Sequence, residues 1–157
     1  ERVHARYIVV GGVAVVLHGH PRFTADLDLV IDFEPGNVKA VLGSLAELGY
    51  RPRAPVSAEQ FASAAVRKSW IEEKGLVVFS FLNPAMPGTE VDLFVEEPFH
   101  FEDAYRRVLH ADLGVATVPV VALEDLCQLK RTSGRPKDLD DIRALEAIAR
   151  EMAPDDD

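Results

Sequence analysis

The stretch that decides the fold is residues 19–35, GHPRFTADLDLVIDFEP, in which acidic and apolar residues alternate. A period of two is typical of a β-strand, because successive side chains of a strand point to opposite faces. We therefore predict a strand over residues 26–32. One side of it would carry Asp26, Asp28 and Asp32, and the other Leu27, Leu29 and Ile31.

Two carboxylates at positions i and i+2 of one strand face, here Asp26 and Asp28, lie within reach of a single site. Like charges placed in this way repel each other. A hard divalent cation removes the conflict, and Mg²⁺ prefers carboxylate oxygens completed by substrate phosphates and water. The alternative is an exposed strand face whose acids are only solvated.

Two other segments favour the metal site. Gly11 and Gly12 follow an apolar strand over residues 7–10, and glycines at a strand exit let backbone N–H groups approach phosphate oxygens. Asp92 lies in EVDLFVEE, a second apolar strand that can pair beside the first. Three carboxylates on adjacent strands can hold two metal ions for phosphoryl transfer. Taken alone, Asp92 is better interpreted as a charge on an edge strand, and together with Asp26 and Asp28 it is better interpreted as a ligand.

The remaining pattern predicts an α+β fold with helices at its C-terminus. Residues 13–20 are a helix or a second strand, since periodicity does not separate the two. Further expected elements are a helix from Pro35 to Gly49, a Pro- and Arg-rich loop over 51–55, a helix opened by a Ser57–Gln60 capping box, strands over 76–82 and 90–95 forming a hairpin, a helix over 99–109, a strand over 114–121, and helices over 123–132 and 136–152. We expect one domain over residues 1–157, with a core over about 6–120 and a helical segment over about 121–153.

Composition narrows the class of protein. No apolar run reaches the roughly 20 residues that a membrane helix needs, so we expect no membrane association. A lone cysteine, Cys127, suits a small core residue and a reducing compartment, and we expect a cytoplasmic location. The net charge of −9 argues against a general nucleic-acid binder. A local basic patch is the exception that we consider, formed by Arg51, Arg53, Arg67, Lys68, Lys130 and Arg131.

These motifs together resemble the nucleotidyltransferase superfamily to which polymerase β belongs. Gly11 and Gly12 fill its two small positions, residues 13–25 form its spacer, and Asp26, Leu27 and Asp28 close the motif. The chain is most similar to the small bacterial AbiEii-like branch of abortive-infection and toxin-antitoxin proteins. The matching positions are Arg22, Thr24, Asp26 and Asp28, and then Leu129, Lys130, Gly134, Arg135, Lys137, Asp138, Asp141 and Ile142.

The resemblance implies a nucleotidyltransferase-like mixed β-sheet flanked by helices. It also implies an enzyme that moves a nucleoside monophosphate from an NTP to a hydroxyl and releases pyrophosphate. The implied cofactor is Mg²⁺ or Mn²⁺. The implied acceptors are tRNA or another RNA end, a protein, or a small molecule such as an aminoglycoside, and an implied partner is a cognate antitoxin protein. The alternative is a non-catalytic module that binds a nucleotide or a partner protein.

The resemblance assigns roles to residues of this chain. Asp26 and Asp28 would hold both metals, and Asp92 would hold the metal that activates the acceptor. The Gly11–Gly12 turn would cradle the β and γ phosphates. The other implied nucleotide-binding residues are Arg22, Thr24 and Lys130.

Several of these residues have a structural alternative. Arg22 is equally a surface arginine, and Lys130 a lysine whose charged end reaches water. We expect capping and ion pairing from Arg135, Lys137, Asp138 and Asp141, a turn rather than a metal pair at His18 and His20, and packing at the core edge rather than base stacking for Trp70.

Overall fold

A computed structural model describes residues 4–154 of the chain. In chain order its elements are β1 (Tyr7–Val10), α1 (Gly11–Leu17), β2 (Leu27–Ile31), α2 (Pro35–Glu47), β3 (Arg51–Pro52), α3 (Ala58–Ala62), α4 (Ala64–Lys74), β4 (Val78–Leu82), β5 (Glu90–Phe94), α5 (Phe101–Arg106), β6 (Leu109–Asp112), β7 (Thr117–Val120), α6 (Leu123–Ser133) and α7 (Pro136–Met152). None of the helices within this described range is long and apolar enough to cross a bilayer.

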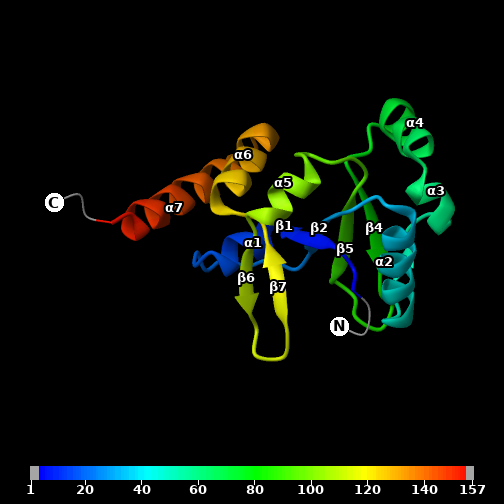
Figure 1. Ribbon diagram of the computed structural model, residues 1–157, viewed down its shortest axis with the longest axis horizontal. Coiled ribbons are helices and arrows are strands. Elements are labelled where there is room, and N and C mark those ends of the chain that lie inside the picture. The colour runs from blue at the N-terminus through cyan, green and yellow to red at the C-terminus, as the bar shows by residue number, and fades with distance from the viewer. Residues whose placement is uncertain (1–3, 155–157) are drawn as a thin grey trace.

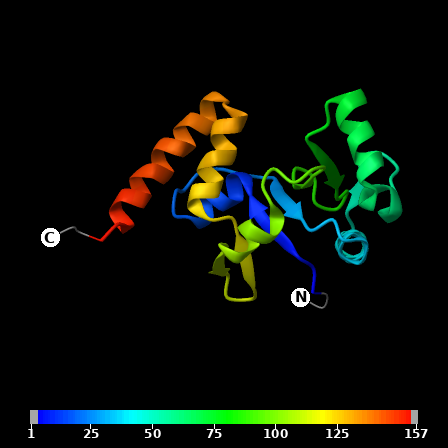
Figure 2. The ribbon, with the colours of Figure 1, turned by 45° about the horizontal axis from the view of Figure 1, so that its top comes forward.

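The strands form one mixed sheet in the order β3-β4-β5-β2-β1-β7-β6. Strand β2 pairs in parallel with β5 and β1 pairs in parallel with β7, while the other neighbours are antiparallel. Helices α6 and α7 lie at one end of the molecule, and α2, α3 and α4 lie at the other (Figures 1 and 2). The predicted α+β class, with a helix-flanked mixed sheet and C-terminal helices, is confirmed.

The centre of the sheet is buried on both faces at one end of β2. The consecutive residues Val30 and Ile31 point to opposite faces, and both are fully buried. Asp28, nearer the start of the strand, is only partly buried. The core therefore covers the last residues of β2 and leaves its first residues open, so polar side chains can gather there.

Strand β2 is shorter than predicted, so Asp32, one of the three acids predicted to share its face, lies outside the strand. Asp32 follows the strand, and its carboxylate accepts hydrogen bonds from Arg6 Nη1 at 2.7 Å and from the backbone N–H of Glu34 at 3.0 Å. These contacts hold Asp32 at the opposite end of β2 from Asp26. It is a structural residue and not part of the carboxylate site.

Residues 13–20 were predicted to form either a helix or a strand. Residues 13–17 lie in the helix α1, which begins two residues earlier than this segment, at Gly11. Gly11 has φ +69°, a backbone conformation that glycine adopts easily, and it turns the chain directly out of β1 into α1. His18 and Gly19 then form a turn, and His20 directly follows it. The Nε2 atom of His18 lies 2.7 Å from the carbonyl oxygen of Val121, so the expected structural role of this histidine is confirmed.

The segment between α2 and β4 differs from the prediction in two places. The expected loop at 51–55 begins with the short strand β3, whose residues pair with the end of β4. The capping box at Ser57 and Gln60 is confirmed, but the helix that it opens ends at Ala62. Ser63 interrupts the chain with an extended backbone and caps α4, since its hydroxyl accepts the N–H of Val66.

The hairpin of β4 and β5 and the two C-terminal helices are confirmed. The predicted helix over 99–109 is wrong at its end, because it stops at Arg106 and residues 109–112 form β6, paired with β7. The segment 108–112 is too short to show a period, and only its pairing with β7 makes it a strand. Strand β5 lies inside the sheet between β4 and β2. The alternative that Asp92 is a charge on an edge strand is therefore wrong.

Candidate functional site

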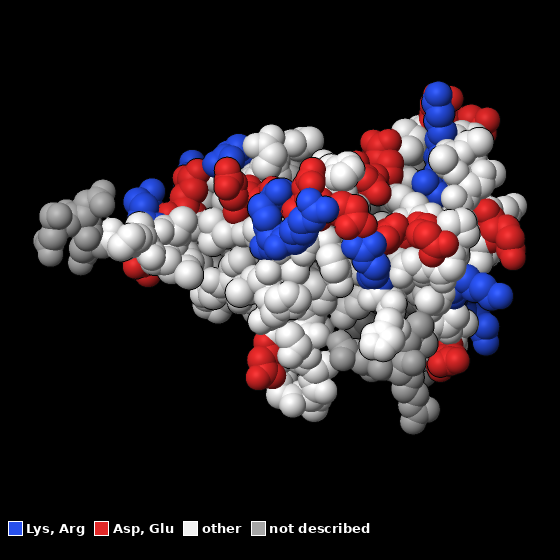
Figure 3. All heavy atoms as spheres, in the orientation of Figure 1, with Lys and Arg blue, Asp and Glu red and all other residues white. Residues whose placement is uncertain are grey.

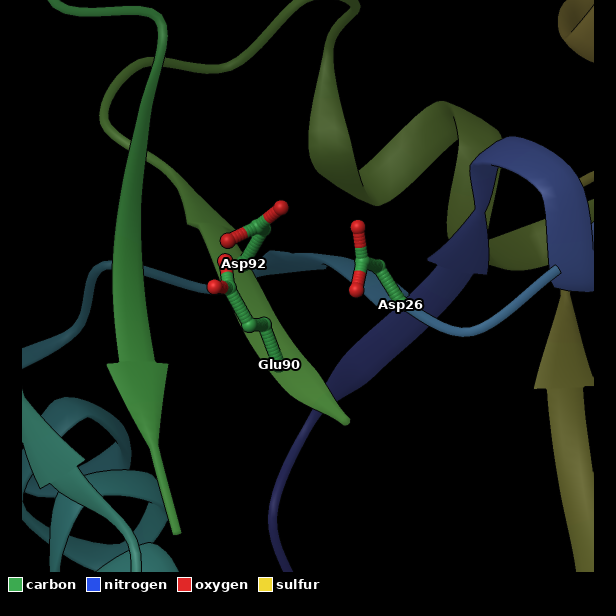
Figure 4. A group of neighbouring side chains, drawn as sticks. All are labelled: Asp26, Glu90 and Asp92. Atoms are coloured by element: carbon green, nitrogen blue, oxygen red, sulfur yellow. The ribbon is translucent and has the colours of Figure 1, made fainter. Parts of the chain in front are cut away.

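Four carboxylates gather where β2 and β5 begin. Asp28 and Asp92 are directly opposite each other in the parallel pairing of the two strands. Asp26 lies just before β2, and Glu90 is the first residue of β5. One carboxylate oxygen from each of Asp26, Glu90 and Asp92 lies within 4.8 Å of the others, from two neighbouring segments of the chain (Figure 4).

The carboxyl group of Asp28 shows the electrostatic strain of this arrangement. Burial, and then the nearby charges of Asp92 and Asp26, raise its pKa to about 6, against an opposing effect of Lys130 and Arg135. The two cations therefore do not offset the burial and the crowding of negative charge. The donor set fits a hard divalent ion such as Mg²⁺ or Mn²⁺, because these ions prefer oxygen ligands and supply the missing positive charge.

Neighbouring strands fix two of the four carboxylates. Ser80 on β4 lies opposite Asp92, and its hydroxyl donates to Asp92 Oδ1 at 2.6 Å. Arg53, just after β3, donates from Nη2 to Glu90 Oε1 at 2.9 Å. The orientation of the acids on β5 thus depends on residues of β4 and of the segment that follows β3.

The two glycines lie against the acid strand and the loop that leads into it. A Cβ atom on Gly11 would run into the Asp28 side chain, and one on Gly12 would lie 2.6 Å from Thr24 Oγ1 and 3.5 Å from Arg22 Cζ. A Cβ atom therefore fits at neither position unless the neighbouring side chain shifts. The same packing brings together five of the predicted site residues, Gly12 with Thr24 and Arg22, and Gly11 with Asp28.

Lys130 and Arg22 share one buried carboxylate. Arg22 Nη1 donates to Asp141 Oδ2 at 2.6 Å, and Lys130 Nζ lies 3.0 Å from the same oxygen and 3.2 Å from Asp138 Oδ1. The Lys130 side chain is only 7% exposed, so its charged end does not reach water. Arg22 is therefore not simply a surface arginine, and Lys130 is not a lysine whose charged end reaches water, because both cations are anchored in one ion-pair network with α7.

The start of α7 completes this network. The backbone N–H and Nε of Arg135 donate to Asp138 Oδ2 at 3.1 and 2.8 Å, so the expected capping and ion pairing are confirmed for these residues. Burial acts to raise the pKa of Asp138, but hydrogen bonds from Arg135 and Lys130 outweigh it and hold that pKa well below its usual range. Lys137 is exposed and is not part of the network.

Three further expectations have clear outcomes. Trp70 packs at the core edge as expected, with ring centroids 5.9 Å from Phe61 and 5.5 Å from Phe79. Cys127 is buried, as expected for a core residue. The basic patch is wrong, because Arg67 is buried with its guanidinium 3.7 Å from the Phe33 ring centroid and Lys130 is buried as well.

The chain matches a family described as "Nucleotidyltransferase of unknown function (DUF6036)" over residues 1–152. It belongs to this nucleotidyltransferase family. The family supports transfer of a nucleotidyl group from an NTP as the general activity. No curated protein matches the chain.

Solved structures share the fold of this nucleotidyltransferase. The lincosamide antibiotic adenylyltransferase LnuA, bound to lincomycin, aligns with a TM-score of 0.56 and 17% identity over 90% of this chain and 86% of its own. A putative nucleotidyltransferase from Thermotoga maritima aligns with a TM-score of 0.55 and 15% identity over 90% of this chain and 82% of its own. At these identities the likeness is one of fold.

The candidate site of this nucleotidyltransferase has neighbouring residues that the sequence analysis did not predict. Glu90 had a signal, since it precedes Asp92 by two positions in an alternating strand and must share its face. The sequence contains no local signal that would place Ser80 or Arg53 beside these acids. Their places beside Asp92 and Glu90 follow from the register of β4 with β5 and with β3, which the local pattern does not encode.

Proposed function

We propose that the protein is a metal-dependent enzyme that transfers a nucleoside monophosphate from an NTP to a hydroxyl acceptor. The observation that carries the proposal is the in-register pair of Asp28 and Asp92, with Asp26 beside it and the Gly11–Gly12 turn packed against Asp28. Membership of a nucleotidyltransferase family supports it.

In this proposal Asp26, Asp28 and Asp92 hold the divalent ions. When bound, Mg²⁺ or Mn²⁺ activates the attacking hydroxyl and stabilises the charge that develops on the leaving pyrophosphate. Ser80 keeps Asp92 Oδ1 in a fixed orientation through its hydrogen bond. The strand pairing of β2 with β5 sets the separation of Asp28 and Asp92, so the carboxylates need little rearrangement before substrate binds.

The nucleotide-binding part of the proposal rests on the contacts of Gly12. Its neighbours Arg22 and Thr24 offer a guanidinium and a hydroxyl, the donors that phosphate oxygens accept from. Lys130 is buried between Asp138 and Asp141. We therefore assign to it the role of a fixed positive charge near Asp28. It also holds Arg22 in place indirectly, because both cations bind Asp141.

We favour a small molecule or a protein over RNA as the acceptor. The net charge is −9, and positive and negative side chains alternate on the face seen in Figure 3 without a broad basic patch. A phosphate backbone is bound mainly by clusters of Lys and Arg, which the burial of Arg67 and Lys130 reduces further. LnuA, which shares the fold, is an adenylyltransferase of a lincosamide antibiotic and thus of a small molecule.

The similarity of Arg22, Thr24 and the α6–α7 motif to AbiEii-like proteins supports a role as the toxin-like partner of a two-gene defence module. Under this proposal, expression of the protein slows growth of a bacterial host and an Asp26→Asn variant does not. Equal growth with both proteins at equal expression would contradict the toxin role and leave the transferase proposal in place.

The first test needs no acceptor. We expect at least one of ATP, CTP, GTP and UTP to raise the melting temperature of the protein with Mg²⁺ and not in its absence, because ligands stabilise the state that they bind. Asp26→Asn should lose this shift, while Asp140→Asn, an exposed change of the same kind on α7, should keep it. A shift that is independent of both Mg²⁺ and Asp26 would support a non-catalytic nucleotide-binding module, and no shift with any NTP would contradict the proposal.

A further inference from the structure

The ion pair between Glu90 and Arg53 lies beside the carboxylates of Asp26 and Asp92 and is partly exposed to solvent. Glu90 shares a strand face with Asp92, and one of its oxygens lies within 4.8 Å of an oxygen of Asp26 and of Asp92. The Glu90 side chain is 31% exposed and that of Arg53 is 61% exposed. Figure 4 shows Glu90 and Asp92 on β5 beside Asp26, so Glu90 is placed to bind whatever these acids bind.

The backbone of Arg53 is held while its side chain stays in water. Its N–H donates to the carbonyl oxygen of Ser80 at 3.0 Å, and Ser80 in turn orients Asp92. The guanidinium reaches from this fixed point to Glu90 Oε1 at 2.9 Å. Arg53 is therefore positioned to meet Glu90, but nothing in the contacts of its side chain prevents it from turning away.

The charges explain why such a pair is useful. Within residues 4–154, neither Asp26 nor Asp92 forms an ion pair, and Arg53 is the cation bonded to Glu90. An exposed Arg–Glu pair contributes little free energy, because water screens it and two long side chains lose freedom. A divalent ion surrounded by several carboxylates binds much more strongly, so it can displace the guanidinium.

We propose that Glu90 is an additional ligand of the metal site and that Arg53 is its exchangeable counter-ion. Arg53 neutralises Glu90 when the site holds no cation, and it moves into solvent when Glu90 turns to the ion. This inference rests on the proposed function, since it assumes that the site binds a divalent metal. It gives the two residues opposite effects on metal affinity, with Glu90 raising it and Arg53 lowering it through competition.

The test is a titration of the whole chain with Mn²⁺ alone, followed by electron paramagnetic resonance of the free ion. We expect Glu90→Gln to weaken binding roughly tenfold or more, as loss of a ligand does. Arg53→Gln should tighten binding about two- to fivefold, the range that an exposed ion pair can contribute. The double variant should bind as Glu90→Gln does, because Arg53 acts only through Glu90. Glu47→Gln, an exposed change of equal charge at the end of α2, is the control and should bind as wild type.

One further variant, Asp26→Asn, separates the failure of this inference from failure of the proposed function. If Asp26→Asn weakens Mn²⁺ binding and Glu90→Gln does not, the metal site stands and the role of Glu90 is overturned. If Arg53→Gln weakens binding, or still tightens it in the Glu90→Gln background, the role of Arg53 is overturned. If the wild-type protein binds no Mn²⁺, both proposals fail. Melting temperatures measured in chelator show that each variant is folded.

Discussion

Asp28 on β2 lies directly opposite Asp92 on β5, on the same face of two parallel neighbouring strands. Without a bound cation this relationship costs free energy, because burial and the nearby charges of Asp92 and Asp26 raise the pKa of Asp28 to about 6. The same pairing that assembles the site therefore weakens the metal-free fold at neutral pH.

We predict that Asp28→Asn stabilises the metal-free protein at pH 7 to 8 by about 1–3 kcal/mol. The folded protein binds the Asp28 proton more tightly than the unfolded chain, whose carboxyl has a pKa of 3.8, so stability falls as pH rises from about 4 to about 6. Asparagine removes this charge. Urea unfolding in chelator at several pH values measures the effect. The gain should vanish below about pH 4, and a variant that is less stable at pH 8 would contradict the electrostatic explanation.

We predict that Gly11→Ala destabilises the protein by about 1–3 kcal/mol, because its φ of +69° disfavours a side chain and the new Cβ meets the Asp28 carboxylate. Gly43→Ala is the matched control. Gly43 lies within α2, and outside its own stretch of helix no atom lies within 4 Å of a new Cβ, so alanine there should stabilise by roughly 0.5–1 kcal/mol. Denaturant unfolding of both variants checks this, and equal effects at the two positions would exclude the proposed clash.

Lys130→Met should destabilise the protein by about 3–5 kcal/mol, since it leaves the buried Asp138 and Asp141 without this partner. Lys39→Met, an exposed change on α2, should alter stability by less than about 0.5 kcal/mol. Thermal and denaturant unfolding measure both. A Lys130→Met protein of wild-type stability with weakened NTP binding would instead assign the ammonium directly to the nucleotide.

Ser80→Ala should weaken Mn²⁺ binding by about tenfold, because loss of the hydrogen bond frees the orientation of Asp92. Its effect on the free energy of unfolding should stay within about 1.5 kcal/mol, the usual contribution of one hydrogen bond. Ser69→Ala removes a hydroxyl that bonds to the carbonyl oxygen of Val66 on α4 and serves as the control for metal binding. Unchanged Mn²⁺ affinity in Ser80→Ala would show that Asp92 needs no support from β4.

Much of the fold could be predicted because its signals are local. The alternation around Asp28 indicates β2. Two apolar periodic segments separated by a glycine, the second of which begins at a proline, indicate α6 and α7. The errors fall where local signal is weak. Strand β6 exists only because it pairs with β7, and Asp32 leaves the acid row because Arg6, distant in sequence, binds it.

The sequence by itself determined which chemical groups are present at the site. They are the acids of two alternating strands and a glycine pair in the turn before them. Tertiary structure alone decided how they meet. The parallel register sets Asp28 against Asp92, the pairing of β4 brings Ser80 to Asp92, and the α6–α7 network buries Lys130 against Asp141. The reason is physical, because side-chain periodicity is a property of each strand or helix, whereas register and ion pairing depend on segments that only folding brings together.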